Sequence, residues 1–279
     1  MARFKWIFIL ALVGGAAIAG GCSETLTSFF HHCCGGEPRG EHTPQPGQAS
    51  FLREHAIVGA TLTSFDEQGQ SRTLKIDAVQ RDPQDAAQEI WLYTVLHQRA
   101  DGQWQNLCLP DHEGIAQAIP LAGRWDQTGT HLDDNSITFA CTNGALAKCV
   151  RWGYKPWKTV QGESLQDYHQ ACTRMVRADY CGNGIGHTQN GIPIDVYDRL
   201  GIQSRTQQSG MTFEAAWGVD GAVYLHRPRF SEAIAQLQVE CPAKLKLLSQ
   251  AASPLEHDPR AEIPEALVFN DSFIQPETP

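Results

Sequence analysis

The sequence has no excess of positive charge and no apolar run of membrane-spanning length. It carries 22 Lys+Arg against 31 Asp+Glu, for a net charge of −9, whereas proteins that bind nucleic acid usually present a basic patch or stripe. Nucleic acid is therefore not an expected partner. The longest apolar run, residues 6–19, falls short of the roughly 20 residues that a spanning helix needs. Since 42% of the residues are hydrophobic, the composition predicts a globular, mildly acidic body.

The N-terminus has the pattern of a secretory signal peptide. Arg3 and Lys5 precede the apolar run, which ends in Ala19-Gly20-Gly21-Cys22. Small residues directly before a cysteine resemble a bacterial lipobox, in which cleavage precedes the cysteine and its sulfur receives a diacylglycerol. We therefore expect residues 1–21 to be a lipoprotein signal peptide and Cys22 to be lipidated, with ordinary secretion as the alternative. Because Ser23 is not the Asp that resembles an inner-membrane retention signal, the outer membrane of the cell envelope is the expected address.

Residues 22–50 are expected to form a flexible tether, because they are rich in Gly and Pro and have no apolar periodicity. The tether contains His31-His32-Cys33-Cys34. Metal ligands usually come from spaced positions with a supporting shell, so no metal site is predicted here. The vicinal cysteines are more typical of cross-linking.

The body, residues 51–250, is predicted to have an α+β fold with an antiparallel, β-rich N-terminal half. Alternating apolar residues and turn residues predict strands over 55–65, 73–79, 90–96, 104–109, 118–125 and 137–141. In the second of these, Leu74, Ile76 and Ala78 are expected on one face. The spacing of about ten residues is typical of a meander, a sandwich or part of a barrel.

The C-terminal half is predicted to be helical and stapled by disulfides. Ser164 is a candidate N-cap with Asp167 three residues later, and apolar residues then follow at helical spacing until Gly182. Shorter helices are expected over 144–152 and 231–240, the latter ending before Pro242. Residues 251–279 contain several prolines and are expected to form an extended tail.

Four segments carry a family resemblance: 137–141, 147–157, 168–174 and 177–182, the last containing Ala178-Asp179-Tyr180-Cys181. Together they resemble the bacterial ADYC domain, over roughly residues 55–230. The resemblance implies an exported bacterial protein. It implies no substrate, cofactor or catalytic residue, because the function of that domain is unknown.

Six cysteines are disulfide candidates in the body: Cys108, Cys141, Cys149, Cys172, Cys181 and Cys241. An even number in an exported chain fits a disulfide framework, and six permit fifteen connectivities. If Cys172 and Cys181 share a helix, they lie about 13.5 Å apart, beyond the roughly 7 Å that a bridge allows. The similar spacings of 141 to 149 and of 172 to 181 suggest two antiparallel segments. That arrangement would bond Cys149 to Cys172, Cys141 to Cys181 and Cys108 to Cys241, with the other connectivities left open.

A catalytic alternative uses Cys181, His187 and Asp195, which fall within fifteen residues. They have the chemistry of a thiol hydrolase acting on cell-wall or peptide substrates: nucleophile, base and orienting acid. However, a cysteine held in a disulfide cannot attack, so the structural interpretation is preferred. A metal site formed by His169, Asp179, His187 and Asp195 would have no known ligand spacing, and no metal or other cofactor is predicted. The glycines at 182, 184 and 186 follow a helix, whereas a phosphate-binding loop precedes one.

An aromatic and basic cluster is the best candidate for non-catalytic binding: Arg151, Trp152, Tyr154, Lys155 and Trp157. Aromatic rings and cations in alternation suit a sugar or a peptide, although core packing accounts for the same pattern. The sequence as a whole predicts a lipid-anchored envelope protein with a binding or structural module. Its expected partners are the membrane, through the N-terminal lipid, and an envelope protein or glycan.

Overall fold

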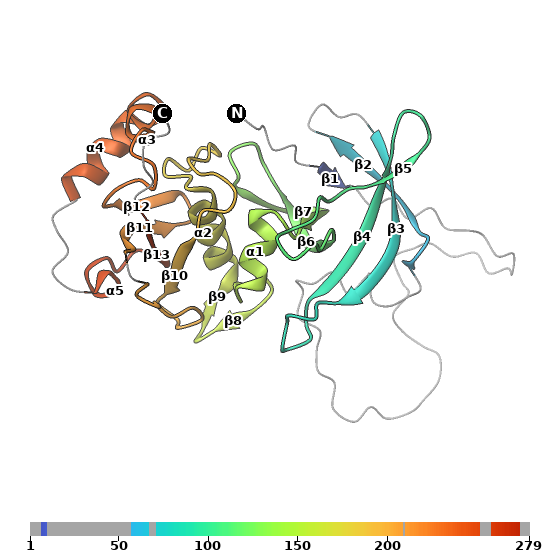
Figure 1. Cartoon of the computed structure of the whole chain (residues 1–279), viewed down its shortest axis with the longest axis horizontal. Coiled ribbons are helices and arrows are strands. Elements are labelled where there is room, and N and C mark those ends of the chain that lie inside the picture. The colour runs from blue at the N-terminus through green and yellow to red at the C-terminus, as the bar shows by residue number, and fades with distance from the viewer. Residues whose placement is uncertain (1–6, 10–56, 67–70, 209, 252–257, 274–279) are drawn as a thin grey trace, which may run out of the picture.

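The computed structural model describes residues 7–9, 57–66, 71–208, 210–251 and 258–273. Cys22 and the expected tether at 22–50 lie outside the described residues, as does the expected signal peptide except for residues 7–9. In the described part, two antiparallel sheets lie side by side with two helices between them (Figure 1). No helix among the described residues is long and apolar enough to cross a membrane.

The first sheet has seven strands, and the six that lie beyond residue 51 confirm the predicted β-rich N-terminal half. They are β1 (Ile7–Ile9), β2 (Thr61–Asp66), β3 (Ser71–Arg81), β4 (Trp91–Gln98), β5 (Trp104–Asn106), β6 (Ala118–Trp125) and β7 (His131–Cys141). Their order is β3-β2-β1-β7-β6-β4-β5, and β3 also pairs with β4, so the sheet closes on itself. Its core contains Leu74, Ile76, Val79, Tyr93, Val95 and Phe139.

One detail of β3 differs from the sequence pattern. Leu74 and Ile76 are buried as predicted, but Ala78 is exposed and Val79 is buried in its place. The register with β4 shifts between Ile76 and Ala78. Such a bulge inserts one residue and reverses the alternation beyond it, which explains why strict alternation failed at Ala78.

The helices between the sheets are α1 (Ala145–Arg151) and α2 (Leu165–Arg177), separated by the short hairpin of β8 (Thr159–Val160) and β9 (Glu163–Ser164). Ser164 caps α2 as predicted, because its side chain accepts a hydrogen bond from the Gln166 amide at 3.2 Å. The buried face of α2 includes Leu165, Tyr168 and Met175.

The helix ends at Arg177, earlier than the predicted stop at Gly182, because the backbone enters the left-handed region at Ala178. The motif after α2 is therefore a turn and not the last part of the helix.

The prediction of a helical C-terminal half is wrong. Residues 194–272 contain a four-stranded antiparallel sheet of order β10-β13-β11-β12. Its strands are β10 (Ile194–Asp198), β11 (Thr212–Gly218), β12 (Gly221–Leu225) and β13 (Val268–Ser272). The helices in this half are α3 (Ala233–Glu240), α4 (Pro242–Ala251) and α5 (Pro259–Glu262). The broader α+β assignment remains correct.

The expected tail and the expected body boundary at 250 are wrong for residues 258–273. All five residues of β13 are buried, between β10 and β11. Pro242 also begins α4 and does not only terminate α3, because proline is well tolerated at the first helical position, where its missing N–H has no partner to lose. The second core, between α2 and this sheet, contains Leu165, Tyr168, Met175, Ala215, Trp217, Leu237, Leu248 and Val268.

Three disulfides join the predicted cysteines in pairs. Cys149 is bonded to Cys172, as predicted, and this bond connects α1 to α2. The other two predicted pairings are wrong, because Cys108 is bonded to Cys141 and Cys181 to Cys241. The prediction failed because α2 ends before Cys181, so the segments 141–149 and 172–181 do not run side by side over their full length.

Candidate functional site

The turn after α2 is built from Ala178, Asp179, Tyr180 and Cys181. Ala178 adopts φ 50° and ψ 43°, and its amide donates to the Met175 carbonyl at 3.0 Å. The Asp179 amide donates to the Arg174 carbonyl at 2.9 Å. These bonds satisfy the last carbonyls of α2 and turn the chain away from the helix axis.

Asp179 is fully buried and holds three segments together. Its carboxylate forms an ion pair with Arg174 at 2.6 Å and accepts hydrogen bonds from the amides of Asn183 and Gly184, at 3.1 and 3.0 Å. The Arg174 guanidinium also donates to the Val219 carbonyl at 3.2 Å. It reaches the carbonyl of Thr128 and the hydroxyl of Thr130 in the turn between β6 and β7. Buried charges need this degree of pairing, so the carboxylate is fully occupied inside the fold.

Tyr180 is also completely buried and lies in a second charged network. Its hydroxyl donates to the Glu214 carboxylate at 3.0 Å and accepts from the Arg229 amide at 2.9 Å. The guanidinium of Arg229 binds the same carboxylate at 2.9 and 3.0 Å. Burial is the largest cause that raises the pKa of Tyr180 well above its ordinary value, and the negative charge of Glu214 is the second. The phenol therefore stays protonated and stacks against Trp217, with ring centroids 5.2 Å apart.

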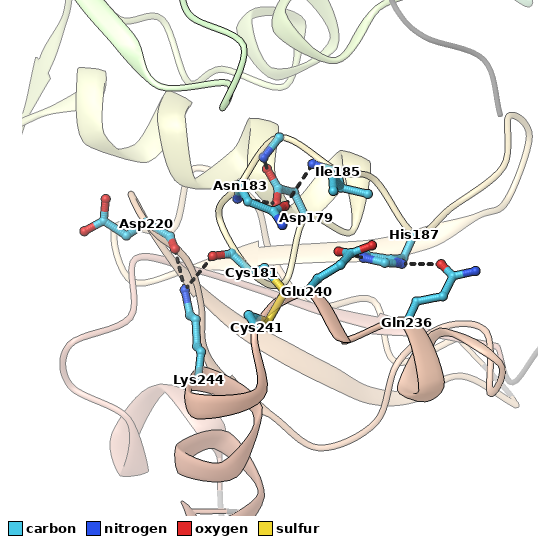
Figure 2. The surroundings of a disulfide bond; sticks show 11 residues. Asp179, Cys181, Asn183, Ile185, His187, Asp220, Gln236, Glu240, Cys241 and Lys244 are labelled. Atoms are coloured by element: carbon cyan, nitrogen blue, oxygen red, sulfur yellow. Dashed lines mark hydrogen bonds and ion pairs between the residues drawn. A yellow bond between two sulfur atoms is a disulfide. The ribbon is translucent and has the colours of Figure 1, made fainter. Parts of the chain in front are cut away.

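Cys181 fastens the turn to the junction of α3 and α4 through its bond to Cys241, as Figure 2 shows. Lys244, in the first turn of α4, donates to the Cys181 carbonyl at 3.5 Å and to the Asp220 carbonyl. Burial lowers the pKa of Lys244 below its ordinary value. On the other side of the disulfide, His187 contacts Gln236 at 3.2 Å and Glu240 at 3.1 Å, both from α3.

The glycines that follow Cys181 allow close packing of backbones. A Cβ at Gly182 would lie 2.1 Å from the Asp220 carbonyl oxygen, in the turn between β11 and β12. A Cβ at Gly184 would lie 2.3 Å from the Gln127 carbonyl oxygen, in the turn between β6 and β7. Both glycines also have positive φ, of 71° and 84°. The loop therefore sits between turns of the two sheets, where only glycine allows so close an approach.

The turn, its buried networks and its disulfide lie within a family match. A model of the ADYC domain matches residues 54–231. The chain belongs to the ADYC family. No curated protein and no solved structure matches it. Cys241 and β13 lie beyond the matched residues, so the described fold of this ADYC protein continues past the family match at its C-terminal end.

The three residues of the catalytic alternative have separate partners in the ADYC protein. Cys181 is bonded to Cys241 and so carries no thiolate. His187 contacts α3, whereas the Asp195 carboxylate accepts hydrogen bonds from the amides of Thr206 and Gln207, both at 2.9 Å. No contact among the described residues joins them as nucleophile, base and orienting acid.

The aromatic and basic cluster is mostly internal. Arg151 pairs with Asp82 at 2.7 Å and with Asp111 at 3.0 Å, and Lys155 pairs with Asp85 at 3.0 Å and with Glu89 at 2.7 Å. Burial alone would lower the pKa of Lys155, but the hydrogen bonds to these two carboxylates outweigh it and raise the pKa. The two cations thus clamp loops of the first sheet onto the segment around α1.

The aromatic members of the cluster pack inward. Tyr154 is fully buried and donates to Asp198 at 2.9 Å, and Trp152 and Trp157 are half-buried against the hydrophobic cores. An exposed ring with a cation above it occurs elsewhere: the Lys75 ammonium lies 5.5 Å from the centre of the Trp104 ring, at β5. Single-sequence reasoning missed this pair because Lys75 and Trp104 meet only through sheet pairing.

The partners of the motif were likewise missed. Glu214, Arg229 and Lys244 lie 34 to 63 residues from the motif residues that they bind. Nothing in their local sequence pattern marks them. Among the described residues, no three His, Cys, Asp or Glu side chains gather in a way that would hold a metal ion.

Proposed function

We propose that this ADYC protein is an exported, lipid-anchored protein of the cell envelope whose globular body is a non-catalytic structural or binding module. The observation that carries the proposal is that residues of the family motif have their partners inside the fold. Asp179, Tyr180 and Cys181 are each occupied by partners inside the fold, through an ion pair, a buried hydrogen-bond network and a disulfide. A motif of this kind stabilises a domain and has no free nucleophile.

The compartment is supported by the three disulfides and by the sequence of the N-terminus. Disulfides persist in oxidising environments outside the cytosol. Ala19-Gly20-Gly21 before Cys22 resembles a lipobox. The proposed location of the anchored protein is the outer membrane. The proposed partners are the membrane, reached through the lipid, and an envelope protein or glycan.

Replacement of Cys22 tests the anchor. We expect Cys22→Ala to move the protein from the membrane fraction to the soluble fraction and to abolish incorporation of a labelled fatty acid, because the acylated sulfur is lost. Cys33→Ala is the matched control in the same segment and should stay in the membrane fraction. Unchanged fractionation of Cys22→Ala would refute the anchor.

A thiol count tests the non-catalytic assignment against the hydrolase alternative. The full-length protein is denatured without reductant, alkylated and mapped by mass spectrometry. We expect no alkylation at Cys181, because its sulfur is bonded to Cys241. A free and reactive thiol at Cys181, together with hydrolysis of cell-wall peptides that Cys181→Ser abolishes, would favour the hydrolase instead.

A further inference from the structure

The three disulfides differ in how far their cysteines are buried. Cys149 and Cys172 are both 0% exposed, and Cys108 is 3% exposed. Cys181 and Cys241 are both half-buried, whereas each of the other two disulfides contains at least one buried cysteine. An external thiolate must reach one sulfur of a disulfide to open it, so exposure favours attack on this bond over the other two.

Cys241 also has the surroundings of a good leaving group. Its carbonyl accepts the first hydrogen bond of α4, from the Leu245 amide at 2.9 Å, which puts Cys241 at the N-cap position of a ten-residue helix. Thiolates are stabilised at helix N-termini and beside cations. Lys244 adds a cation near this disulfide, because its ammonium donates to the backbone carbonyl of Cys181, which is bonded to Cys241.

Apart from the disulfide, few polar contacts hold α3 and α4 against the turn of residues 178–181, the motif turn, and its neighbours. His187 contacts Gln236 and Glu240, and Lys244 contacts the carbonyls of Cys181 and Asp220. The sheet underneath does not depend on these contacts, since β13 is paired to β10 and β11 along its whole length. Leu237 of α3 and Leu248 of α4 also lie in the second core. The α3–α4 segment can therefore loosen from the motif turn while the second sheet remains intact.

We propose that the Cys181–Cys241 disulfide is a site of thiol–disulfide exchange with a dithiol reductant, and that its opening releases the α3–α4 segment from the motif turn. A thiolate of the dithiol attacks the sulfur of Cys181, the bond to Cys241 breaks, and Cys241 leaves as a thiolate. The second thiol of the reductant, once deprotonated, attacks the mixed disulfide and displaces Cys181. Two electrons pass to the protein, the dithiol becomes a disulfide, and its two protons pass to the two cysteines or to solvent. The inference does not depend on the lipid anchor.

Graded reduction of the native, full-length protein tests this selectivity. Samples are treated for a fixed, short time with rising concentrations of dithiothreitol, trapped with N-ethylmaleimide and mapped by mass spectrometry. We expect labelling of Cys181 and Cys241 at concentrations about tenfold lower than labelling of the other two pairs, with far-ultraviolet circular dichroism unchanged. If the three disulfides open together, or if Cys108–Cys141 opens first, the proposal is refuted.

Two lysines in α4 provide a matched pair of variants. Lys244→Gln should slow the opening of Cys181–Cys241 about threefold, because a nearby cation that favours the leaving thiolate is removed. Lys246→Gln removes the same charge from an exposed position of the same helix and should leave the rate unchanged. Equal rates of disulfide opening for the two variants would show that Lys244 does not assist the reaction.

Proteolysis tests the release of the segment. Reduction of Cys181–Cys241 in the unaltered chain, and the double variant Cys181→Ser/Cys241→Ser, should each make Lys246 a site of rapid tryptic cleavage. Should the double variant not fold, the reduced wild-type chain decides the question. Full protection of Lys246 after selective reduction would show that the disulfide does not hold the segment.

Discussion

Removal of a single oxygen atom from Tyr180 tests whether the family motif is a structural centre. Tyr180→Phe keeps the ring stacked on Trp217 but removes the hydroxyl between Glu214 and Arg229. The Arg229 amide then has no acceptor in a fully buried position, and the Glu214 carboxylate loses one of three donors. An orphaned buried group costs about 1–3 kcal/mol, and a lost hydrogen bond adds about 1 kcal/mol. We expect a decrease of about 2–4 kcal/mol in the free energy of unfolding.

Urea unfolding followed by circular dichroism measures this change, with an unaltered slope as the sign that both proteins unfold in the same way. Tyr168→Phe is the matched control. Its hydroxyl donates to Glu163 at 2.7 Å, but Glu163 is exposed and can turn to water. The control should lose about 1 kcal/mol or less. If Tyr180→Phe is no more destabilising than Tyr168→Phe, the motif tyrosine is not the structural centre that we describe.

Two further predictions concern His169 and Gly182. Burial lowers the pKa of His169 to about 4, from 6.5, so the unfolded chain takes up a proton between these pH values that the folded chain does not. The contribution of neutral His169 to the free energy of unfolding is therefore fully present above pH 6.5 and falls by up to about 3 kcal/mol as the pH drops toward 4. The difference in unfolding free energy between the wild type and His169→Gln should shrink over this range. A constant difference would contradict the assignment. Gly182→Ala forces a Cβ against the Asp220 carbonyl at positive φ and should cost at least about 2 kcal/mol. Gly191→Ala, which also has positive φ but open space around it, should cost about 1 kcal/mol in thermal unfolding.

Local sequence patterns predicted the elements whose two faces differ. The alternation in the first part of β3 reflects one buried and one exposed side, and the Ser164 cap of α2 is a local contact between a side chain and the backbone. They predicted neither the left-handed turn at Ala178 nor the bulge in β3, because both arise from contacts across the fold. The motif turn was therefore recognised as a string of residues without its structural role.

The strand β13 shows why the second sheet was missed. It contains Asn270 and Asp271, yet it is buried on both faces, so it has no polar side to alternate with. Two of its polar side chains bind distant residues: the Asn270 carbonyl oxygen accepts from the Trp217 indole at 2.8 Å, and Asp271 pairs with Arg205 at 2.7 Å. A segment that looks like a polar tail is thus stable as a central strand only because these partners are already in place.

The position of β13 also fixes the order in which the second sheet can assemble. A ribosome makes residues 268–272 after the other described strands, yet they fill the place between β10 and β11. Until they emerge, the hairpin of β11 and β12 and the strand β10 each expose an unpaired edge, which is a template for aggregation. A chain that stops near residue 250 would keep the complete family match but lack the middle of its sheet. The second sheet can therefore close only after residues 268–272 have been made, so the chain is vulnerable to misassembly until β13 is in place.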